Sequence, residues 1–214
     1  MKLISMSIYG TGQMYLEGAV ANARLMPKIY PGWRLLVHIA DDIPPGIITK
    51  LILLGADVKK MGLAKGHSGM LWRFLPAWDP TIGFTLFRDS DSRFNPREAA
   101  AVKAWIRSGK DAHCMHDHSH HASLPLFGGM WGIRGKVLEG PCPFQRAFHR
   151  RIPRGEDMRL LRRFVLPKIK DSLLRHSSVK TPKDWGPTKP FPKHTTWNGF
   201  VGQQYDDEGK PIFV

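Results

Sequence analysis

Asp89 and Asp91 are two carboxylates with one residue between them. They follow an apolar run at 83–87 that is typical of a buried strand. Open α/β sheets bind ligands at the carboxyl ends of their strands, so both side chains are expected at a ligand site. Such oxygen ligands can share one Mg²⁺ or Mn²⁺ ion, which keeps further positions for water and substrate phosphates. The adjacent Arg88 and Arg93 would neutralise additional phosphate charge. A solvated cluster of surface ion pairs among these four side chains is the alternative.

Three further positions could contact a nucleotide. Arg73 lies on a predicted helix and could reach a diphosphate; its alternative is a surface arginine. Asp41 follows the second predicted strand, where such sheets contact a base or ribose, and a turn before Pro44 explains it equally well. Gly10 opens a short glycine loop after the first strand, but the sequence has neither a Walker lysine motif nor a full dinucleotide fingerprint.

A histidine-rich stretch at 113–121 invites a zinc hypothesis, but its spacing fits no structural zinc pattern. Asp117 and His118 are instead candidates for lining an acceptor pocket, with a plain polar loop as the alternative. Further along, Gly129 lets the backbone approach a ligand closely. Trp131 could then stack on a sugar or base ring, and a buried tryptophan packed over small residues is nearly as good an interpretation.

The elements that must position these residues alternate between strand and helix. Apolar runs and helical spacing predict strands at 3–9, 34–40, 56–61, 83–87 and 111–116, and helices at 15–26, 47–54, 70–78, 96–108 and 156–167. Pro27 is expected to end the first helix, and Asn95 with Pro96 to begin the fourth. The order β-α-β-α-β predicts an α/β domain with a mostly parallel central sheet flanked by helices.

The chain has 214 residues, a formal net charge of +14 and 42% apolar residues, which is enough to build a core. The segment 146–193 holds fourteen Lys and Arg and four acidic residues, a local net charge of +10. This asymmetry indicates a polyanionic partner, namely nucleic acid, nucleotide phosphates or both; a solvated basic face is the alternative. We expect one domain over 1–180 and an extended, proline-rich C-terminal segment over 181–214 packed on it.

No apolar run approaches the 18 residues of a membrane span, and the N-terminus lacks a signal-peptide pattern. Two cysteines make no disulfide framework. The sequence therefore predicts a cytoplasmic protein, of a bacterial or virus-infected cell, without membrane insertion.

The motifs resemble those of GT-A-fold glycosyltransferases, in which an Asp-x-Asp motif holds a divalent metal against the diphosphate of a nucleotide sugar. The chain looks most similar to a group of small bacterial and viral transferases of this type. The resembling stretches are Met70–Phe74, Arg88–Arg93, Glu98–Trp105, Met115–His118, Gly128–Gly132, Phe191–Pro192 and Phe200–Gln203, which cover most of the chain. The resemblance implies a single GT-A-like (Rossmann-like) domain.

The resemblance also implies roles for individual residues. Asp89 and Asp91 would hold Mn²⁺ or Mg²⁺ and the donor diphosphate, and His176 is the candidate third metal ligand. Glu156 and Asp157 resemble the acidic pair that such enzymes place near the acceptor hydroxyl, where a carboxylate takes the proton. Their alternative role is to complement the dipole of the helix that they begin.

The acceptor is not set by the resemblance. Charge favours nucleic acid, with a hydroxymethylated base in DNA as the preferred acceptor and a polysaccharide, lipid-linked glycan or protein as the alternative. Two rivals of another class remain, namely a nucleic-acid-binding module with an inert Asp89/Asp91 pair and a metal-dependent nuclease that uses the same carboxylates.

Overall fold

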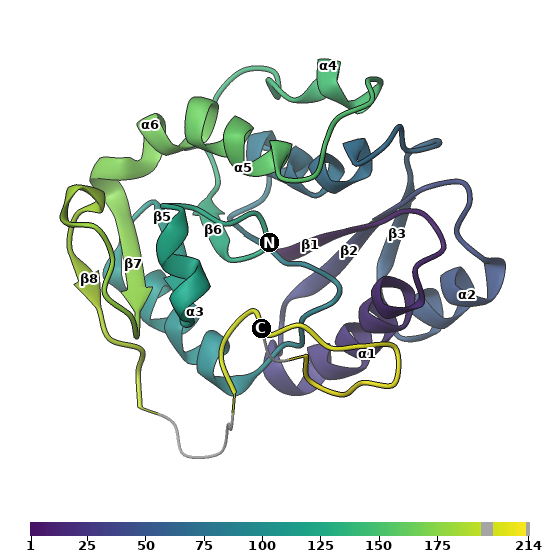
Figure 1. The fold of residues 1–214 in the computed structure, drawn as a ribbon, viewed down its shortest axis with the longest axis horizontal. Coiled ribbons are helices and arrows are strands. Elements are labelled where there is room, and N and C mark those ends of the chain that lie inside the picture. The colour runs from purple at the N-terminus through teal and green to yellow at the C-terminus, as the bar shows by residue number, and fades with distance from the viewer. Residues whose placement is uncertain (194–198, 213–214) are drawn as a thin grey trace.

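An eight-stranded sheet in the order β3-β2-β1-β4-β6-β5-β7-β8 forms the centre of the computed structural model, which describes residues 1–193 and 199–212 (Figure 1). All neighbouring strands are parallel except β6, which is antiparallel to β4 and β5. The strands are β1 (Lys2–Ile8), β2 (Arg34–Ile39), β3 (Asp57–Lys60), β4 (Phe84–Phe87), β5 (Ala112–His116), β6 (Trp131–Arg134), β7 (Leu173–Ser177) and β8 (Thr188–Lys189). The expected open, mostly parallel sheet is confirmed.

Helices cover both faces of this sheet (Figure 1). On one side lie α1 (Gln13–Ile29), α2 (Pro45–Leu53) and α3 (Pro96–Ser108); on the other lie the 3₁₀ stretch η1 (Ser68–Trp78) and α4 (Gln145–Phe148), α5 (Glu156–Leu160) and α6 (Leu166–Ile169). Two short 3₁₀ turns, η2 (Ser119–Ser123) and η5 (Lys183–Trp185), lie in the connections.

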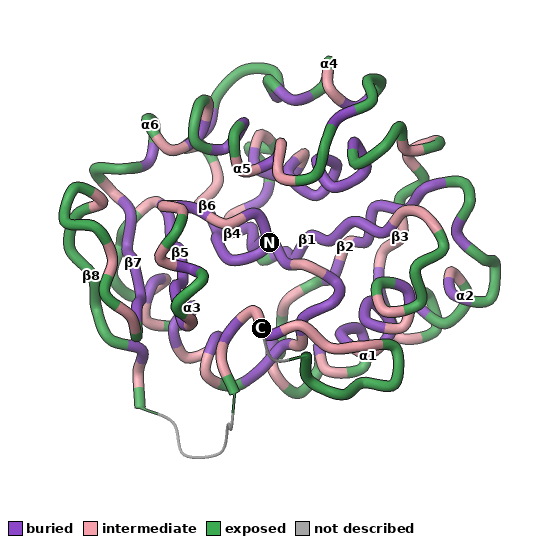
Figure 2. The backbone as a smooth tube through the Cα atoms, viewed as in Figure 1, coloured by how far each residue is buried: buried purple, intermediate pink, exposed green. Residues whose placement is uncertain are grey.

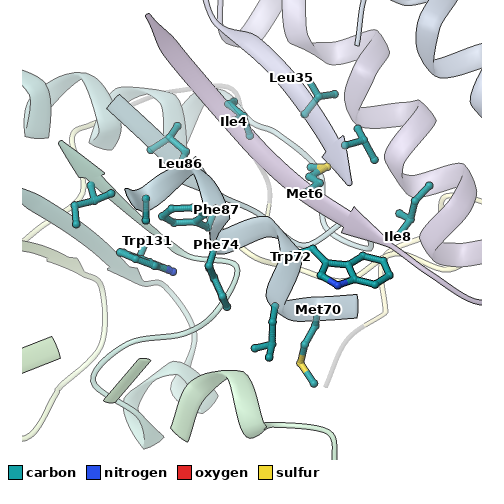
Figure 3. Packing of buried hydrophobic residues seen from close by; sticks show 14 of the residues in the cluster. Ile4, Met6, Ile8, Leu35, Met70, Trp72, Phe74, Leu86, Phe87 and Trp131 are labelled. Atoms are coloured by element: carbon teal, nitrogen blue, oxygen red, sulfur yellow. The ribbon is translucent and has the colours of Figure 1, made fainter. Parts of the chain in front are cut away.

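The core lies between the central strands and η1. Leu86 and Phe87 are adjacent in β4, so their side chains point to opposite faces of the sheet. The Phe87 ring lies 4.3 Å from the ring of Trp131 and 5.4 Å from that of Phe74 (Figure 3). Figure 2 shows the central strands buried and the segments around α4, α6 and β8 largely exposed. This apolar centre fixes β4, at whose carboxyl end Asp89 follows.

Helix α3 begins and ends as its sequence predicts. Asn95 accepts a hydrogen bond from the backbone N–H of Glu98 at 2.9 Å, Pro96 occupies the first turn, and Gly109 ends the helix at φ +74°. The Asn95 side chain thus bonds a backbone N–H that has no partner within the helix, and Gly109 ends the helix in a left-handed conformation that favours glycine.

Three other helices differ from the prediction. Pro27 does not end α1, which runs on to Ile29. The helix expected at 70–78 is a 3₁₀ stretch. The helix expected at 156–167 is interrupted by the π-helical turn η3 (Leu161–Val165) before α6 continues with Pro167 in its first turn. Proline has no backbone N–H to donate, so Pro167 fits the first turn of α6. It could not make the hydrogen bond that an unbroken helix from α5 would require at this position.

The C-terminal segment returns to the sheet. Thr188 pairs with Arg175 of β7, and residue Gln204 forms an isolated antiparallel bridge with Ser92. The backbone N–H of Tyr205 donates to the carbonyl of Asp91 at 2.9 Å. The division at residue 180 stays a prediction. Within the described residues, no helix is long and apolar enough to cross a membrane.

Candidate functional site

A cavity of about 510 Å³ opens at the carboxyl ends of β1, β4 and β5. Six segments that are far apart in the sequence line it: 7–15 after and at the end of β1, 67–73 in η1, 89–92 after β4, 118–130 after β5, 154–158 before and in α5, and 200–204 near the C-terminus. Asp89, Asp91 and Asp157 all line this cavity. The sequence prediction that Asp89 and Asp91 reach a ligand cavity at a strand end agrees with this placement.

Arg73 links two of these carboxylates. Its Nη2 donates to Asp157 Oδ2 at 2.9 Å, and its Nη1 donates to Asp89 Oδ1. The side chains of Arg73 and Asp157 are only 6% and 7% exposed, whereas that of Asp89 is 45% exposed. The guanidinium therefore holds the carboxylate after β4 and the carboxylate of α5 on one cavity wall. Arg73 lines the cavity as expected, but its charge is already balanced by these two partners.

Asp91 is held by a residue from the other end of the chain. The Gln204 side-chain amide donates to Asp91 Oδ2 at 2.7 Å. Burial and the nearby charge of Asp89 raise the pKa of Asp91 to about 6. The ionised form of Asp91 is therefore energetically unfavourable in the protein alone, and a cation bound beside it would stabilise that form.

Asp157 and its neighbour Glu156 have different environments. Burial raises the pKa of Asp157, even though Arg73 acts in the opposite direction. Glu156 points elsewhere: it forms an ion pair with Arg159 one turn along the helix, and it does not line the cavity. Of the predicted acidic pair, only Asp157 lines the cavity.

Two glycines let the carboxylates approach the loop before β6. A Cβ added to Gly129 would lie 1.9 Å from Asp89 Oδ2, and one added to Gly128 would lie 2.4 Å from both Asp157 Oδ2 and Arg73 Nη2. Real Cβ atoms do not approach other atoms so closely, so the backbone here is close to both acids because it carries no side chain. The expected close approach at Gly129 is thus made to Asp89, at the cavity wall.

Two predicted phosphate-binding arginines are engaged elsewhere. Arg88 is buried, lies 3.5 Å from Glu98, and donates to the carbonyl oxygens of Phe87 and Trp131. Arg93 donates to the backbone carbonyls of Ser90 and Ser92, and its guanidinium lies over the Tyr205 ring. Neither lines the cavity. The predicted donor contacts of Arg88 and Arg93 are therefore corrected, because both guanidinium groups tie the loop after β4 to its surroundings.

His176 is not brought to the carboxylates. It lies on β7, three strands from β4 in the sheet, and shares a 2.7 Å hydrogen bond with His113. Burial lowers the pKa of His176 to about 4, and the side chain does not line the cavity. The prediction of a third metal ligand at His176 is corrected, since regular strand pairing continues through this residue.

Asp117 and His118, predicted together, separate in the structure. Asp117 is buried and accepts hydrogen bonds from Arg97 and Ser178 and from the backbone N–H of Val201. It therefore anchors the C-terminal segment and does not face the cavity. The His118 ring does line the cavity and stacks on Phe200 at a centroid distance of 4.4 Å.

The remaining predicted contacts also lie outside the cavity lining. Trp131 is fully buried beside Phe87 (Figure 3), so its ring is part of the core and is not free to stack on a ligand. Asp41 is exposed after β2, and Gly10 turns the chain at φ +71° just beyond Tyr9, which does line the cavity. The ligand roles predicted for these three residues are not supported by the geometry.

The carboxylates Asp89 and Asp91 are suitable ligands for a divalent cation. Among residues 1–193 and 199–212, no three His, Cys, Asp or Glu side chains form a ready-made metal cluster. Mg²⁺ usually takes only one or two carboxylates and completes its shell with water and substrate phosphates, which Asp89 and Asp91 can provide for. Three carboxylates and two arginines line the cavity, so an anionic ligand needs additional positive charge there.

Several cavity residues carried no recognisable sequence signal. Tyr9, Tyr15, Arg154 and Gln204 line the cavity from three separate segments. Single aromatic or amide side chains outside a motif cannot be told from ordinary surface residues. The Phe200–Gln203 stretch was part of the family resemblance, and this was the only hint that the C-terminal segment reaches the site.

No protein-family model matches the sequence, and no curated protein is significantly similar to it. Solved structures do resemble it. Glucosyl-3-phosphoglycerate synthase from Mycobacterium tuberculosis, in complex with phosphoglyceric acid, gives a TM-score of 0.52 at 14% identity, over 86% of this chain and 74% of that one. TarS 1–349 from S. aureus gives a TM-score of 0.52 at 15% identity, over 85% of this chain and 59% of that one.

A third similar structure is 4-diphosphocytidyl-2C-methyl-D-erythritol synthase from Anaerococcus prevotii DSM 20548. It gives a TM-score of 0.50 at 12% identity, over 81% of this chain and 87% of that one. At these identities the comparisons establish the architecture, which is the GT-A-like fold that the motifs predict. A shared fold does not by itself define a reaction.

Proposed function

We propose that this chain is a glycosyltransferase that uses a nucleotide sugar and a divalent cation, with a hydroxymethylated base in DNA as its acceptor. The observation that carries the proposal is the pair Asp89 and Asp91 at the end of β4, which line one cavity together with Asp157. A neighbouring structure supports the donor class, since glucosyl-3-phosphoglycerate synthase was solved with Mn²⁺, uridine-diphosphate-glucose and glycerol 3-phosphate (TM-score 0.51).

The reaction needs a leaving group that is stabilised and an acceptor that is deprotonated. When bound by Asp89 and Asp91, Mn²⁺ or Mg²⁺ supplies Lewis-acid stabilisation of the leaving diphosphate. The acceptor oxygen forms a bond to the anomeric carbon as the bond from that carbon to the diphosphate oxygen breaks, and the electron pair leaves with the nucleoside diphosphate. The acceptor proton passes to the Asp157 carboxylate.

Asp157 suits this role as a general base for two reasons. Its raised pKa brings it closer to neutral pH, where a base is most effective in proton transfer. Arg73 donates to Oδ2 of this carboxylate at 2.9 Å, and Asp157 lines the cavity that an acceptor hydroxyl would enter. Arg73 itself holds Asp157 and Asp89 in a fixed relation and takes no proton.

The charge distribution supports DNA as the acceptor. Of the fourteen Lys and Arg in 146–193, all except Arg175 are exposed, and the segment reaches the cavity at Arg154. Several such side chains can contact phosphates. A duplex base would have to be flipped out, or met in a single strand, to reach Asp157.

The donor site is tested by calorimetric titration of a panel of nucleotide sugars with Mn²⁺ and then with EDTA. We expect one donor to bind only with Mn²⁺, and Asp91→Ala to abolish that binding. Asp184→Ala is the matched control, because Asp184 is exposed and lies outside the cavity. Failure of every donor to bind to folded wild-type protein would reject the glycosyltransferase proposal.

The acceptor is tested with a radiolabelled donor and DNA that contains hydroxymethylcytosine or plain cytosine. Label should enter only the hydroxymethylated DNA, and DNA binding should weaken by orders of magnitude between about 50 and 200 mM salt if six or more phosphates are contacted. Transfer to a glycan in place of DNA would reject the acceptor and keep the transferase. Cleavage of plain DNA would select the nuclease.

A further inference from the structure

We propose that Arg154 is the residue that binds the diphosphate of the donor. This inference rests on the proposed function and names a contact that the sequence motifs did not indicate. A donor diphosphate carries at least two negative charges, and a guanidinium is well suited to bind phosphate oxygens in pairs. The question is which arginine of the site is available.

The three arginines near Asp89 and Asp91 are already engaged. Arg73 is shared by two carboxylates, Arg88 is buried beside Glu98, and Arg93 binds the carbonyls of Ser90 and Ser92. Moving any of them onto a ligand would leave a buried carboxylate or backbone carbonyl without its partner. Such a loss costs more than a new surface contact returns.

Arg154 is in a different situation. It is exposed, it lines the cavity, and within residues 1–193 and 199–212 it has no ion-pair or hydrogen-bond partner. Gly155 follows it with φ +83°, a left-handed conformation that favours glycine, and the chain then enters α5. This turn brings Arg154 and Asp157, three residues apart, to the same cavity.

The balance of charges in the cavity lining also indicates Arg154. The described lining holds Asp89, Asp91 and Asp157 against Arg73 and Arg154, and Arg73 is neutralised by two of these acids. Apart from histidines, Arg154 is thus the one cation of the described lining whose charge no carboxylate balances. An entering diphosphate meets attraction at Arg154 and at a cation held by Asp89 and Asp91, and repulsion from the acids elsewhere.

Arg154, Asp91 and Tyr15 line one cavity. Burial and the charge of Asp91 raise the pKa of the Tyr15 phenol, whereas the charge of Arg154 lowers it. Ser7 lines the same cavity, and its buried hydroxyl has no hydrogen-bond partner among the described residues.

The test compares Arg154→Gln with Arg151→Gln by calorimetric titration in the presence of Mn²⁺. Arg151 lies on the same loop and is also exposed, but it does not line the cavity. The probes are inorganic pyrophosphate, four nucleoside diphosphates and their nucleosides. We expect Arg154→Gln to weaken binding of pyrophosphate and of the preferred nucleoside diphosphate about tenfold or more, the effect of losing a hydrogen bond to a charged group. Affinity for the nucleoside should be unchanged, and Arg154→Lys should recover part of the loss.

Two results would overturn the inference: equal binding of pyrophosphate by wild type and Arg154→Gln, or an equal loss in Arg151→Gln, which would indicate a diffuse basic surface. The proposed function fails in a different way. If wild type binds pyrophosphate through Arg154 but no nucleotide sugar of the panel, the anion site stands and the glycosyltransferase assignment does not.

Discussion

Arg73 and Asp157 form a buried ion pair, with Nη2 to Oδ2 at 2.9 Å, and both residues line the cavity. The other end of the same guanidinium holds Asp89. A carboxylate at the end of β4 and another in α5, separated by 68 residues, are thereby fixed relative to one another. One side chain therefore contacts both carboxylates and fixes their spacing.

Arg73→Met is expected to lower the free energy of unfolding by about 3–5 kcal/mol at pH 7.5, because it leaves Asp157 buried without its cation. The pKa of Asp157 is already above its unfolded value, and losing Arg73 raises it further. The penalty therefore shrinks as pH falls toward the unfolded aspartate value, about 3.9. Urea unfolding at pH 7.5 and pH 5 measures both effects.

The control for this experiment is Arg34→Met. Arg34 also forms an ion pair, with Asp57, but both side chains are largely exposed, so its loss should cost less than about 1 kcal/mol. If Arg73→Met proved no more destabilising than Arg34→Met, the pair with Asp157 would not be structural.

Asp91→Asn is expected to stabilise the metal-free protein by about 1–3 kcal/mol at pH 7.5. The folded pKa of Asp91 is raised to about 6, so ionisation opposes folding fully above pH 6 and not at all below pH 4. The amide removes that charge and can still accept the bond from Gln204. Thermal unfolding between pH 4 and pH 8 should show the gain growing with pH, whereas a pH-independent change would contradict it.

Local sequence signals were enough to predict the fold, but they predicted the candidate site only in part. Helix α3 could be predicted because Asn95, Pro96 and Gly109 act through their immediate neighbours. Asp89 and Asp91 could be placed because they directly follow a buried strand. In both cases, the residues that decide the outcome are adjacent in sequence.

Contacts between distant segments could not be predicted. Arg88 follows the same strand as Asp89, yet its partner Glu98 is reached only when α3 packs on the sheet. From the sequence, a role for Trp131 in stacking on a ligand is slightly preferred over a place in the core, and only the Phe87 ring packed against it shows that it belongs to the core (Figure 3). Gln204 lies 113 residues from Asp91, and no spacing rule joins them.

Gly129→Ala is expected to disrupt the site with a direct steric cause. Its new Cβ would lie 1.9 Å from Asp89 Oδ2 and 2.9 Å from the Asp89 backbone nitrogen, so the loop or the carboxylate must move. We expect Mn²⁺-dependent binding of the donor to fall at least tenfold. Titration of the donor together with a thermal melt measures this.

Gly46→Ala is the matched control for Gly129→Ala. Gly46 lies in the first turn of α2, and a Cβ there meets nothing within 4 Å. Because alanine is a better helix former than glycine, this variant should keep donor binding and gain up to about 1 kcal/mol in stability. Equal donor binding by both variants would show that Asp89 tolerates displacement.

Gln204→Met is expected to weaken Mn²⁺ binding about tenfold without unfolding the protein. Methionine matches glutamine in length but cannot donate to Asp91 Oδ2, and residues that orient metal ligands typically affect affinity 10–100-fold. The segment stays anchored because the backbone N–H of Tyr205 donates to the Asp91 carbonyl and that of Val201 donates to the Asp117 carboxylate, so its path should persist. Titration of Mn²⁺ followed by electron paramagnetic resonance reads the affinity directly. Gln145→Met on α4, outside this cavity, should bind Mn²⁺ as wild type does. An unchanged affinity in Gln204→Met would mean that Asp91 is oriented by its backbone alone.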